Sequence, residues 1–195
     1  VIATFLPREV VDSLYMTMQK CGLEVVSMTL EPIAAINAAI PKDLRLLNLA
    51  LIDIGAGTSD IAVCRDGAVT GYTMATVAGD EITEVLMKQF LVDFQTAEQI
   101  KMQYAAQESL SFTNILGLEE TVSRAQIEQL LTDPIGHLAG EIVKRVTELN
   151  NGAPSAVFLA GGGSKLAGLK EAVSEKFNMD AKRVAIAGGN FRLSA

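Results

Sequence analysis

Residues 49–60 read LALIDIGAGTSD, and the interpretation of the whole chain begins with them. Their apolar beginning, Leu49–Ile52, is typical of a buried strand that carries Asp53 to its end. A second apolar run starts directly after Asp60, so two carboxylates flank one short turn between two strands. Because Mg²⁺ prefers oxygen ligands and keeps several of its waters, such a pair of carboxylates suits it. The stretch therefore predicts a strand–turn–strand unit with a cation at the turn.

The turn itself contains Gly55 and Gly57, followed by Thr58. Since glycine lacks a Cβ atom, the backbone N–H groups of such a turn can approach a ligand closely, and consecutive N–H groups form a concavity that binds anions. Aspartate and glycine also favour turns for local reasons, but an ordinary hairpin needs only two turn residues. A dinucleotide fingerprint would need a third glycine and a helix directly after it. The sequence thus favours a magnesium–phosphate site.

The composition is that of a globular protein. The 195 residues suffice for one large or two small domains, and 49% of them are hydrophobic and 20% charged. A net charge of −7 argues against a nucleic-acid-binding surface. No apolar stretch reaches the roughly 18 residues of a transmembrane helix, and residues 1–15 do not resemble a secretory signal. We therefore expect a cytoplasmic protein without a transmembrane segment.

The sequence does not favour a catalytic or metal-binding role for histidine or cysteine. His137 is the only histidine and falls within a helical pattern, which indicates a position on a helix surface rather than a nucleophile system. Cys21 and Cys64 are isolated in apolar surroundings, so we expect two buried free thiols rather than a disulfide or a metal pair.

The apolar patterns predict an alternation of strands and helices. Strands are expected at 1–6, 23–30, 48–54, 60–65, 68–75, 155–160 and 183–187. Helices are expected to start at 7, 31, 80, 96, 123, 133 and 165. Asp66-Gly67 between two β-patterned runs is a strong hairpin signal. Three meandering strands followed by α/β crossovers predict a mixed sheet with helices on its faces.

Several boundaries rest on local signals. Thr96–Gln99 and Ser123–Gln126 both have capping-box form, and Asp133-Pro134 is a typical helix start. Residues 108–122 are the least patterned stretch.

A strand–helix–strand pattern occurs at both ends of the chain, at 1–30 and at 156–187. If one unit is duplicated, the first copy lacks its three opening strands. We then expect Val1 to lie inside a domain and the chain to be part of a longer protein.

Element order and motifs together resemble the actin-like ATPase superfamily, which includes actin, DnaK-type chaperones, MreB, FtsA and sugar kinases. The strings LEPIAA at 30–35 and ALIDIGAGT at 50–58 look closest to FtsA-like cell-division proteins and chaperone-like bacterial relatives. The resemblance covers 1–187 as the second half of the ATPase core. It implies a ribonuclease H-like mixed sheet with a small, mainly helical insert.

The resemblance also implies a domain division. Residues 1–44 would be the end of a first lobe with its connecting helix. Residues 45–94 and 131–195 would form the core of the second lobe, and 95–130 the insert.

The resemblance assigns roles around the phosphates. Asp53 would hold waters on Mg²⁺, and Asp60 would lie at the metal and attacking-water side. Glu31 would orient the attacking water, although a plain helix start is the alternative for Glu-Pro. The backbones of Gly55, Gly57 and Thr58 would cradle the β- and γ-phosphates.

Three further motifs would contact the nucleoside. Gly79 would lie near phosphate and ribose, although Ala78 replaces the glycine that often precedes it in the family. Glu98 and Lys101 would reach ribose and purine, with a solvated ion pair as the alternative. Residues of the adenosine motif would lie against the nucleoside, with Lys165 over the adenine, or would form only a structural turn: Gly161, Gly162, Gly163, Ser164 and Lys165.

The resulting hypothesis is the ATP-binding half of an actin-like ATPase, FtsA-like, with Mg-ATP between two lobes. Hydrolysis or nucleotide sensing would be coupled to conformational change. A non-hydrolysing scaffold or filament protein and a sugar- or acetate-type kinase are the alternatives. A protein partner or self-association is expected. The family's first phosphate loop is absent from the sequence, so we expect weak or no turnover from this chain alone.

Overall fold

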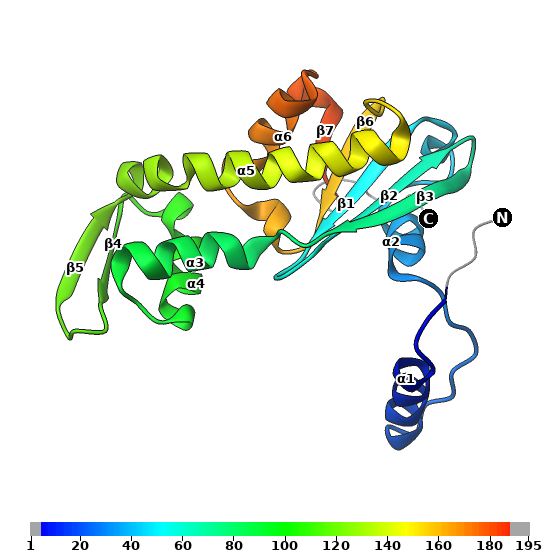
Figure 1. The fold of residues 1–195 in the computed structure, drawn as a ribbon, viewed down its shortest axis with the longest axis horizontal. Coiled ribbons are helices and arrows are strands. Elements are labelled where there is room, and N and C mark those ends of the chain that lie inside the picture. Colours follow the sequence, from blue (N-terminus) through cyan, green and yellow to red (C-terminus); the bar gives the residue numbers. More distant parts are fainter. Residues whose placement is uncertain (1–4, 188–195) are drawn as a thin grey trace.

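A computed structural model describes residues 5–187, which form one five-stranded mixed sheet, a smaller two-stranded sheet and flanking helices (Figure 1). The strands of the larger sheet are β1 (Leu49–Ile54), β2 (Ser59–Arg65), β3 (Ala68–Ala75), β6 (Ala156–Ala160) and β7 (Val184–Ile186). Their order is β3-β2-β1-β6-β7, with the β1–β2 and β2–β3 pairs antiparallel and the β1–β6 and β6–β7 pairs parallel. The predicted meander and mixed sheet are confirmed.

The β2–β3 hairpin turns at the Asp-Gly pair, as predicted. Asp66 and Gly67 both have positive φ, 52° and 80°. This is the backbone twist that a tight two-residue hairpin needs, and Asp-Gly adopts it readily.

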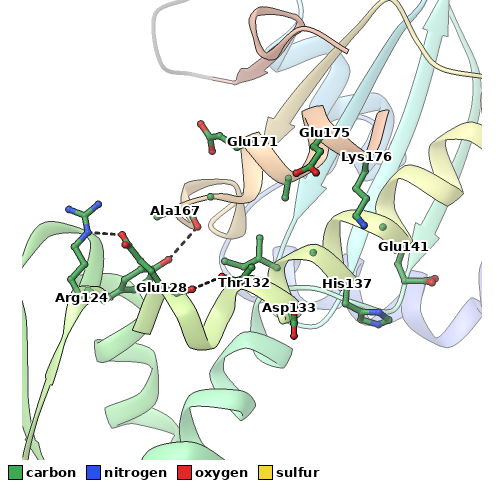
Figure 2. Close-up of a pocket in the computed structure, with 16 residues that line it drawn as sticks. Arg124, Glu128, Thr132, Asp133, His137, Glu141, Ala167, Glu171, Glu175 and Lys176 are labelled. Atoms are coloured by element: carbon green, nitrogen blue, oxygen red, sulfur yellow. Dashed lines mark hydrogen bonds and ion pairs between the residues drawn. The ribbon is translucent and has the colours of Figure 1, made fainter. Parts of the chain in front are cut away.

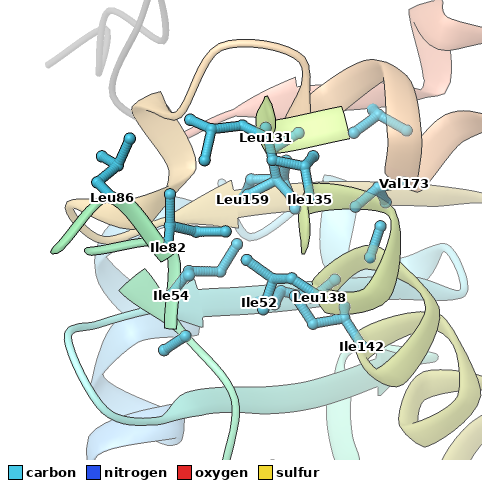
Figure 3. Close-up of a cluster of buried hydrophobic side chains, with 14 of the residues drawn as sticks. Ile52, Ile54, Ile82, Leu86, Leu131, Ile135, Leu138, Ile142, Leu159 and Val173 are labelled. Atoms are coloured by element: carbon cyan, nitrogen blue, oxygen red, sulfur yellow. The ribbon is translucent and has the colours of Figure 1, made fainter. Parts of the chain in front are cut away.

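Strand β1 is buried on both faces, which explains its unbroken apolar sequence. Ala50, Ile52 and Ile54 belong to the larger core, with α3 (Gly79–Phe90), α5 (Arg124–Asn150) and α6 (Leu169–Phe177), as Figure 3 shows. Leu49 and Leu51 belong to a smaller core on the opposite face, closed by α2 (Glu31–Ala39). The strand that carries Asp53 is therefore fixed from both sides.

Helix α5 is continuous from Arg124 to Asn150, so the prediction of a helix start at Asp133-Pro134 was wrong. The capping box of Ser123 and Gln126 is confirmed as the actual start. Proline inside a helix removes one backbone hydrogen bond and crowds the carbonyl of the preceding turn, which destabilises the helix locally. The buried face on both sides of Pro134, including Leu131 and Leu138, holds the helix in one line against the sheet.

Residues 95–130, predicted to form a mainly helical insert, contain more β structure than the sequence indicated. Helix α4 (Phe94–Gln103) is followed by the short helix η2 (Tyr104–Ala106) and the hairpin of β4 (Ser109–Thr113) and β5 (Glu119–Ser123). The hairpin spans residues 109–123, almost the whole unpatterned stretch, where Leu110 and Val122 are the only buried apolar residues and Phe112 is partly buried against the core. So few apolar residues on the inner face give no recognisable alternation.

The prediction that a helix starts at the capping box of Thr96 was wrong. The N-cap of α4 is Asp93, whose carboxylate accepts a hydrogen bond of 2.7 Å from the Thr96 N–H. Aspartate is as good a cap as threonine, and Asp93 is the candidate that lies directly before the apolar Phe94.

The segment from residue 5 to residue 30, which contains α1 (Arg8–Lys20), lies apart from the sheet (Figure 1). Helix α1 forms where predicted, but it buries none of its residues. The strand predicted at 23–30 is absent: these residues lie outside any helix or strand, and Val26 is 96% exposed. A strand needs a neighbouring strand for its backbone hydrogen bonds, and no other described segment pairs with this one. Phe5 and Leu6 of the strand predicted at 1–6 are also outside any strand, and 1–4 fall outside the described residues.

The remaining connections are short helical turns, η1 (Leu44–Leu46), η3 (Gly163–Lys165) and η4 (Ala181–Arg183). The helix predicted from Lys165 starts only at Leu169, because Gly168 has a φ of 85° and interrupts the helical backbone.

Both cysteines are free thiols. Cys64 is buried as predicted, but Cys21, which follows α1, is exposed. No described helix is long and apolar enough to cross a membrane.

We expect Pro134→Ala to raise the free energy of unfolding by roughly 1–3 kcal/mol, because alanine restores an N–H donor inside a helix that is already continuous. Urea denaturation measures this change. Gly136→Ala in the same helix is the calibrating control: an added Cβ would have no atom within 4 Å, and its gain should be about 0.5–1 kcal/mol. A loss of stability in Pro134→Ala would contradict the account of α5.

Candidate functional site

A cavity of about 310 Å³ lies at the end of the sheet where β1 and β6 terminate. This volume is at the low end of the roughly 300–1,000 Å³ of small-molecule sites. Five segments that are distant in sequence line it: the β1–β2 turn, the start of α3, the α4–η2 segment, α5 through Leu138, and the segment after β6. Their lining residues include Gly55, Ala56, Gly79, Asp80, Glu98, Lys101, Tyr104, Gly162, Gly163 and Lys165.

The β1–β2 turn is fixed through its carbonyl groups. The Gly79 N–H donates to Gly55 O at 3.1 Å, and the Asp80 N–H donates to Ala56 O at 2.8 Å. Ala56 and Gly57 are exposed, and no described backbone acceptor takes a hydrogen bond from either N–H. The turn is therefore held in place while two consecutive N–H groups remain open to an anion.

Asp53 and Asp60 are direct partners in the antiparallel β1–β2 ladder. Side chains of directly opposed residues project from the same face of a sheet. Burial, and to a smaller extent the charge of Asp60, raises the pKa of Asp53. A bound cation would favour the ionised form and relieve this repulsion. In the described part of the chain no three histidine, cysteine or acidic residues gather around one point, so waters or ligand oxygens would complete a Mg²⁺ shell here.

The glycine run after β6 packs directly on the end of β1. A Cβ atom at Gly161, whose φ is +78°, would overlap Asp53 Oδ1 and Ile54 O. A Cβ atom at Gly163 would overlap the Ile54 side chain, whereas Gly162 has open space. The Ser164 hydroxyl is buried and donates to Gly161 O at 2.7 Å. Gly161 and Ser164 thus build the turn, and Gly162 and Gly163 form part of the cavity wall.

Glu98 and Lys101 form an ion pair at the other side of the cavity. Their side chains are only 27% and 15% exposed. Burial raises the pKa of Glu98. The hydrogen bonds from Lys101 and Thr83 and the charge of Lys101 together lower this pKa by more than burial raises it, so the net shift is downward. The pair is therefore anchored in the protein, unlike the solvated ion pair considered from sequence.

The structure brings half of the sequence-predicted residues to the cavity wall. These are Gly55, Gly79, Glu98, Lys101, Gly162, Gly163 and Lys165. Gly57 and Thr58 belong to the same turn, and Asp53 and Asp60 lie at its base.

Glu31 is not among the residues that line the cavity. It is the exposed first residue of α2, whose Ile36 and Ile40 pack under the sheet.

Sequence reasoning missed Thr83 and Tyr104. Thr83 is fully buried and contacts both Glu98 and Lys101. Tyr104 is 2% exposed and donates a hydrogen bond of 3.3 Å to Ala167 O. The only sequence signal for Thr83 was its position four residues after Gly79, a polar residue on the apolar face of its helix.

A larger groove of about 970 Å³ lies between α5 and α6 (Figure 2). It contains Glu141, Glu171 and the exposed His137, which confirms the helix-surface position of this histidine. None of the sequence-predicted site residues line it. Tyr104 and Ala167 line both hollows and so form the wall between the groove and the smaller cavity.

Comparison with known proteins decides the family. The model of "Cell division protein FtsA" matches residues 50–191 of this chain. The chain belongs to the FtsA family. It is 30% identical over 177 residues to FtsA of Pseudomonas aeruginosa, covering 83% of this chain and 42% of that protein. It is 23% identical over 193 residues to FtsA of Escherichia coli K12, covering 88% and 45%. The chain thus spans less than half the length of these FtsA relatives.

Solved structures show the fold beyond the FtsA family. MreB5 of Spiroplasma citri bound to AMPPNP superposes with a TM-score of 0.71 at 24% identity, covering 95% of this chain and 60% of that one. The PilM–PilN type IV pilus biogenesis complex gives 0.71 at 20% identity, covering 92% and 47%. The fold is therefore the actin-like ATPase fold, as the sequence resemblance implied.

We expect Glu98→Gln to destabilise the protein by about 1 kcal/mol near pH 7, because it removes the charge from a partly buried pair. The pKa of Glu98 is lower in the folded chain, so its contribution is present above the unfolded pKa and is lost as pH falls through the folded pKa. The difference from the unsubstituted protein should shrink below about pH 4.

Urea denaturation across pH measures this difference. Glu84→Gln, which breaks the exposed Glu84–Lys88 pair, is the control and should change stability by less than about 0.5 kcal/mol at every pH. A Glu98→Gln effect that stays constant down to pH 3 would contradict an anchored ionised carboxylate.

Proposed function

We propose that this chain is the ATP-binding half of an FtsA-like actin-fold ATPase. Mg-ATP would bind in the cavity at the end of β1 and β6, and the opposite wall of the cleft would come from another lobe. The observation that carries this proposal is that residues from four nucleotide motifs of the resemblance line one cavity. These motifs are far apart in the sequence, so their meeting at one cavity is expected if they bind one ligand.

The chain's own residues divide the work of binding. The open N–H groups of Ala56 and Gly57 would hold phosphate oxygens. Asp53 and Asp60 would hold Mg²⁺ through its waters, because carboxylate oxygens are among the ligands that Mg²⁺ prefers. When bound, Mg²⁺ neutralises charge on the phosphate oxygens.

The nucleoside would lie farther along the cavity. Glu98 and Lys101 would face the ribose, and the backbone at Gly162 and Gly163 would lie against the nucleoside with Lys165 over the adenine. The crystal structure of a relative, MreB5 of Spiroplasma citri, contains AMPPNP and shares this fold over 95% of the present chain, which supports a nucleotide as the ligand.

Hydrolysis would require more than this chain. Phosphoryl transfer depends on positioning and charge stabilisation from both sides of the cleft. Asp60 lies beside Asp53, but Glu31, the other candidate for positioning water, is exposed on α2. Full activity would therefore need the second lobe, and this chain alone should turn over ATP weakly or not at all.

A nucleotide-dependent scaffold is the second candidate function. Membership of the FtsA family favours a role in cell division, in which nucleotide would control conformation and the recruitment of a protein partner or another copy. One structural neighbour was solved as the PilM–PilN complex, that is, together with a protein partner. The same evidence favours the scaffold over a sugar or acetate kinase, and a cytoplasmic site of action fits it.

Calorimetric titration with Mg-ATP tests the proposal. We expect Asp53→Ala to weaken binding at least about tenfold, equal to about 1.4 kcal/mol, because it removes the carboxylate nearest to the proposed cation. Asp43→Ala, at an exposed aspartate outside the cavity, is the matched control and should bind as the unsubstituted chain does. Equal heats for Asp53→Ala and the unsubstituted chain would refute the assigned phosphate site.

A further inference from the structure

Thr83 is a polar residue at a fully buried position of α3, with 0% of its surface exposed. A buried hydroxyl costs free energy unless it is hydrogen-bonded. Its Oγ1 atom accepts a hydrogen bond of 2.8 Å from Lys101 Nζ and contacts Glu98 Oε1 and Gly79 O, the latter at 3.2 Å. One hydroxyl therefore joins the start of α3 to the ion pair of α4.

Lys101 has no donor left for a ligand in this arrangement. An ammonium group has three protons, and Nζ donates to Gly79 O at 3.0 Å, to Thr83 Oγ1 and to Glu98 Oε1. Its position is therefore set by protein acceptors on three sides.

Glu98 is held through one oxygen only. Oε1 accepts from both Lys101 and Thr83, whereas Oε2 takes no hydrogen bond from any described residue. Glu98 lines the cavity, so Oε2 is the carboxylate oxygen available to a donor inside it. A hydroxyl of a sugar is the donor that a nucleotide would offer there.

We propose that Thr83 is a positioning residue for the nucleotide: its hydroxyl fixes Glu98 through Oε1 so that Oε2 can accept a hydrogen bond from the ribose. The proposal rests on the proposed function. Thr83 does not line the cavity itself and acts only through Glu98 and Lys101.

Thr83→Val tests the proposal, because valine keeps the shape of threonine and removes the hydroxyl. We expect Mg-ATP to bind about 10- to 150-fold more weakly, the loss that follows when a charged group gives up one hydrogen bond. The readout that separates positioning from folding is sugar selectivity. Either 2′-deoxy-ATP or 3′-deoxy-ATP lacks the hydroxyl that Glu98 contacts. For that analogue, Thr83→Val should reduce the affinity much less than it reduces the affinity for ATP.

Two further variants complete the test. Thr83→Ser keeps the hydroxyl and should bind Mg-ATP and discriminate its deoxy analogues as the unsubstituted chain does. Thr132→Val removes a helical threonine whose hydroxyl donates only to the carbonyl four residues earlier, and it should leave binding unchanged. Should Thr83→Val not fold, Thr83→Ala replaces it.

The outcomes separate the two proposals. Equal affinity of Thr83→Val and the unsubstituted chain for ATP would overturn the positioning role while leaving nucleotide binding intact. An equal loss for ATP and both deoxy analogues would also overturn it, because it would indicate a general packing defect. Failure of the unsubstituted chain itself to bind Mg-ATP would overturn the proposed function, and the positioning role with it.

Discussion

The double pairing of β1 is the constraint on which the rest of the structure depends. β1 runs antiparallel to β2 and parallel to β6, so Asp53 lies opposite Asp60 on one side and Ala160 on the other. The turn after β1 and the glycine turn after β6 consequently emerge at the same end of the sheet. Gly161 then approaches Asp53 and Ile54 so closely that no side chain fits between them. This contact sets the separation of the two cavity walls.

The same constraint imposes an electrostatic cost. The sheet register forces two carboxylates together at a partly buried position, and the pKa of Asp53 is raised as a result. At the other side of the cavity Glu98, Lys101 and Thr83 are bonded to one another. The like-charged pair of Asp53 and Asp60 lies where a cation is expected, and perturbed pKa values cluster at functional sites.

The sequence predicted the sheet because β1, β2, β3 and β6 carry continuous or alternating apolar runs with clear turn residues between them. It failed where local signals compete. Pro134 resembles a helix start, but packing of Leu131 and Leu138 keeps α5 continuous. Residues 23–30 have strand composition but no described neighbour to pair with. Among the site residues, the glycines and acidic residues were recognisable from their spacing in the sequence. Thr83 was not, because it acts through contacts between two helices that no sequence pattern shows.

Amide hydrogen exchange with and without Mg-ATP would test the central claim most directly, namely that the two glycine turns form the walls of one nucleotide cavity. The account predicts slower exchange at Ala56 and Gly57 and at 161–163 when Mg-ATP is added, with little change in the α5–α6 groove. Unchanged exchange at both turns, or protection confined to that groove, would contradict it.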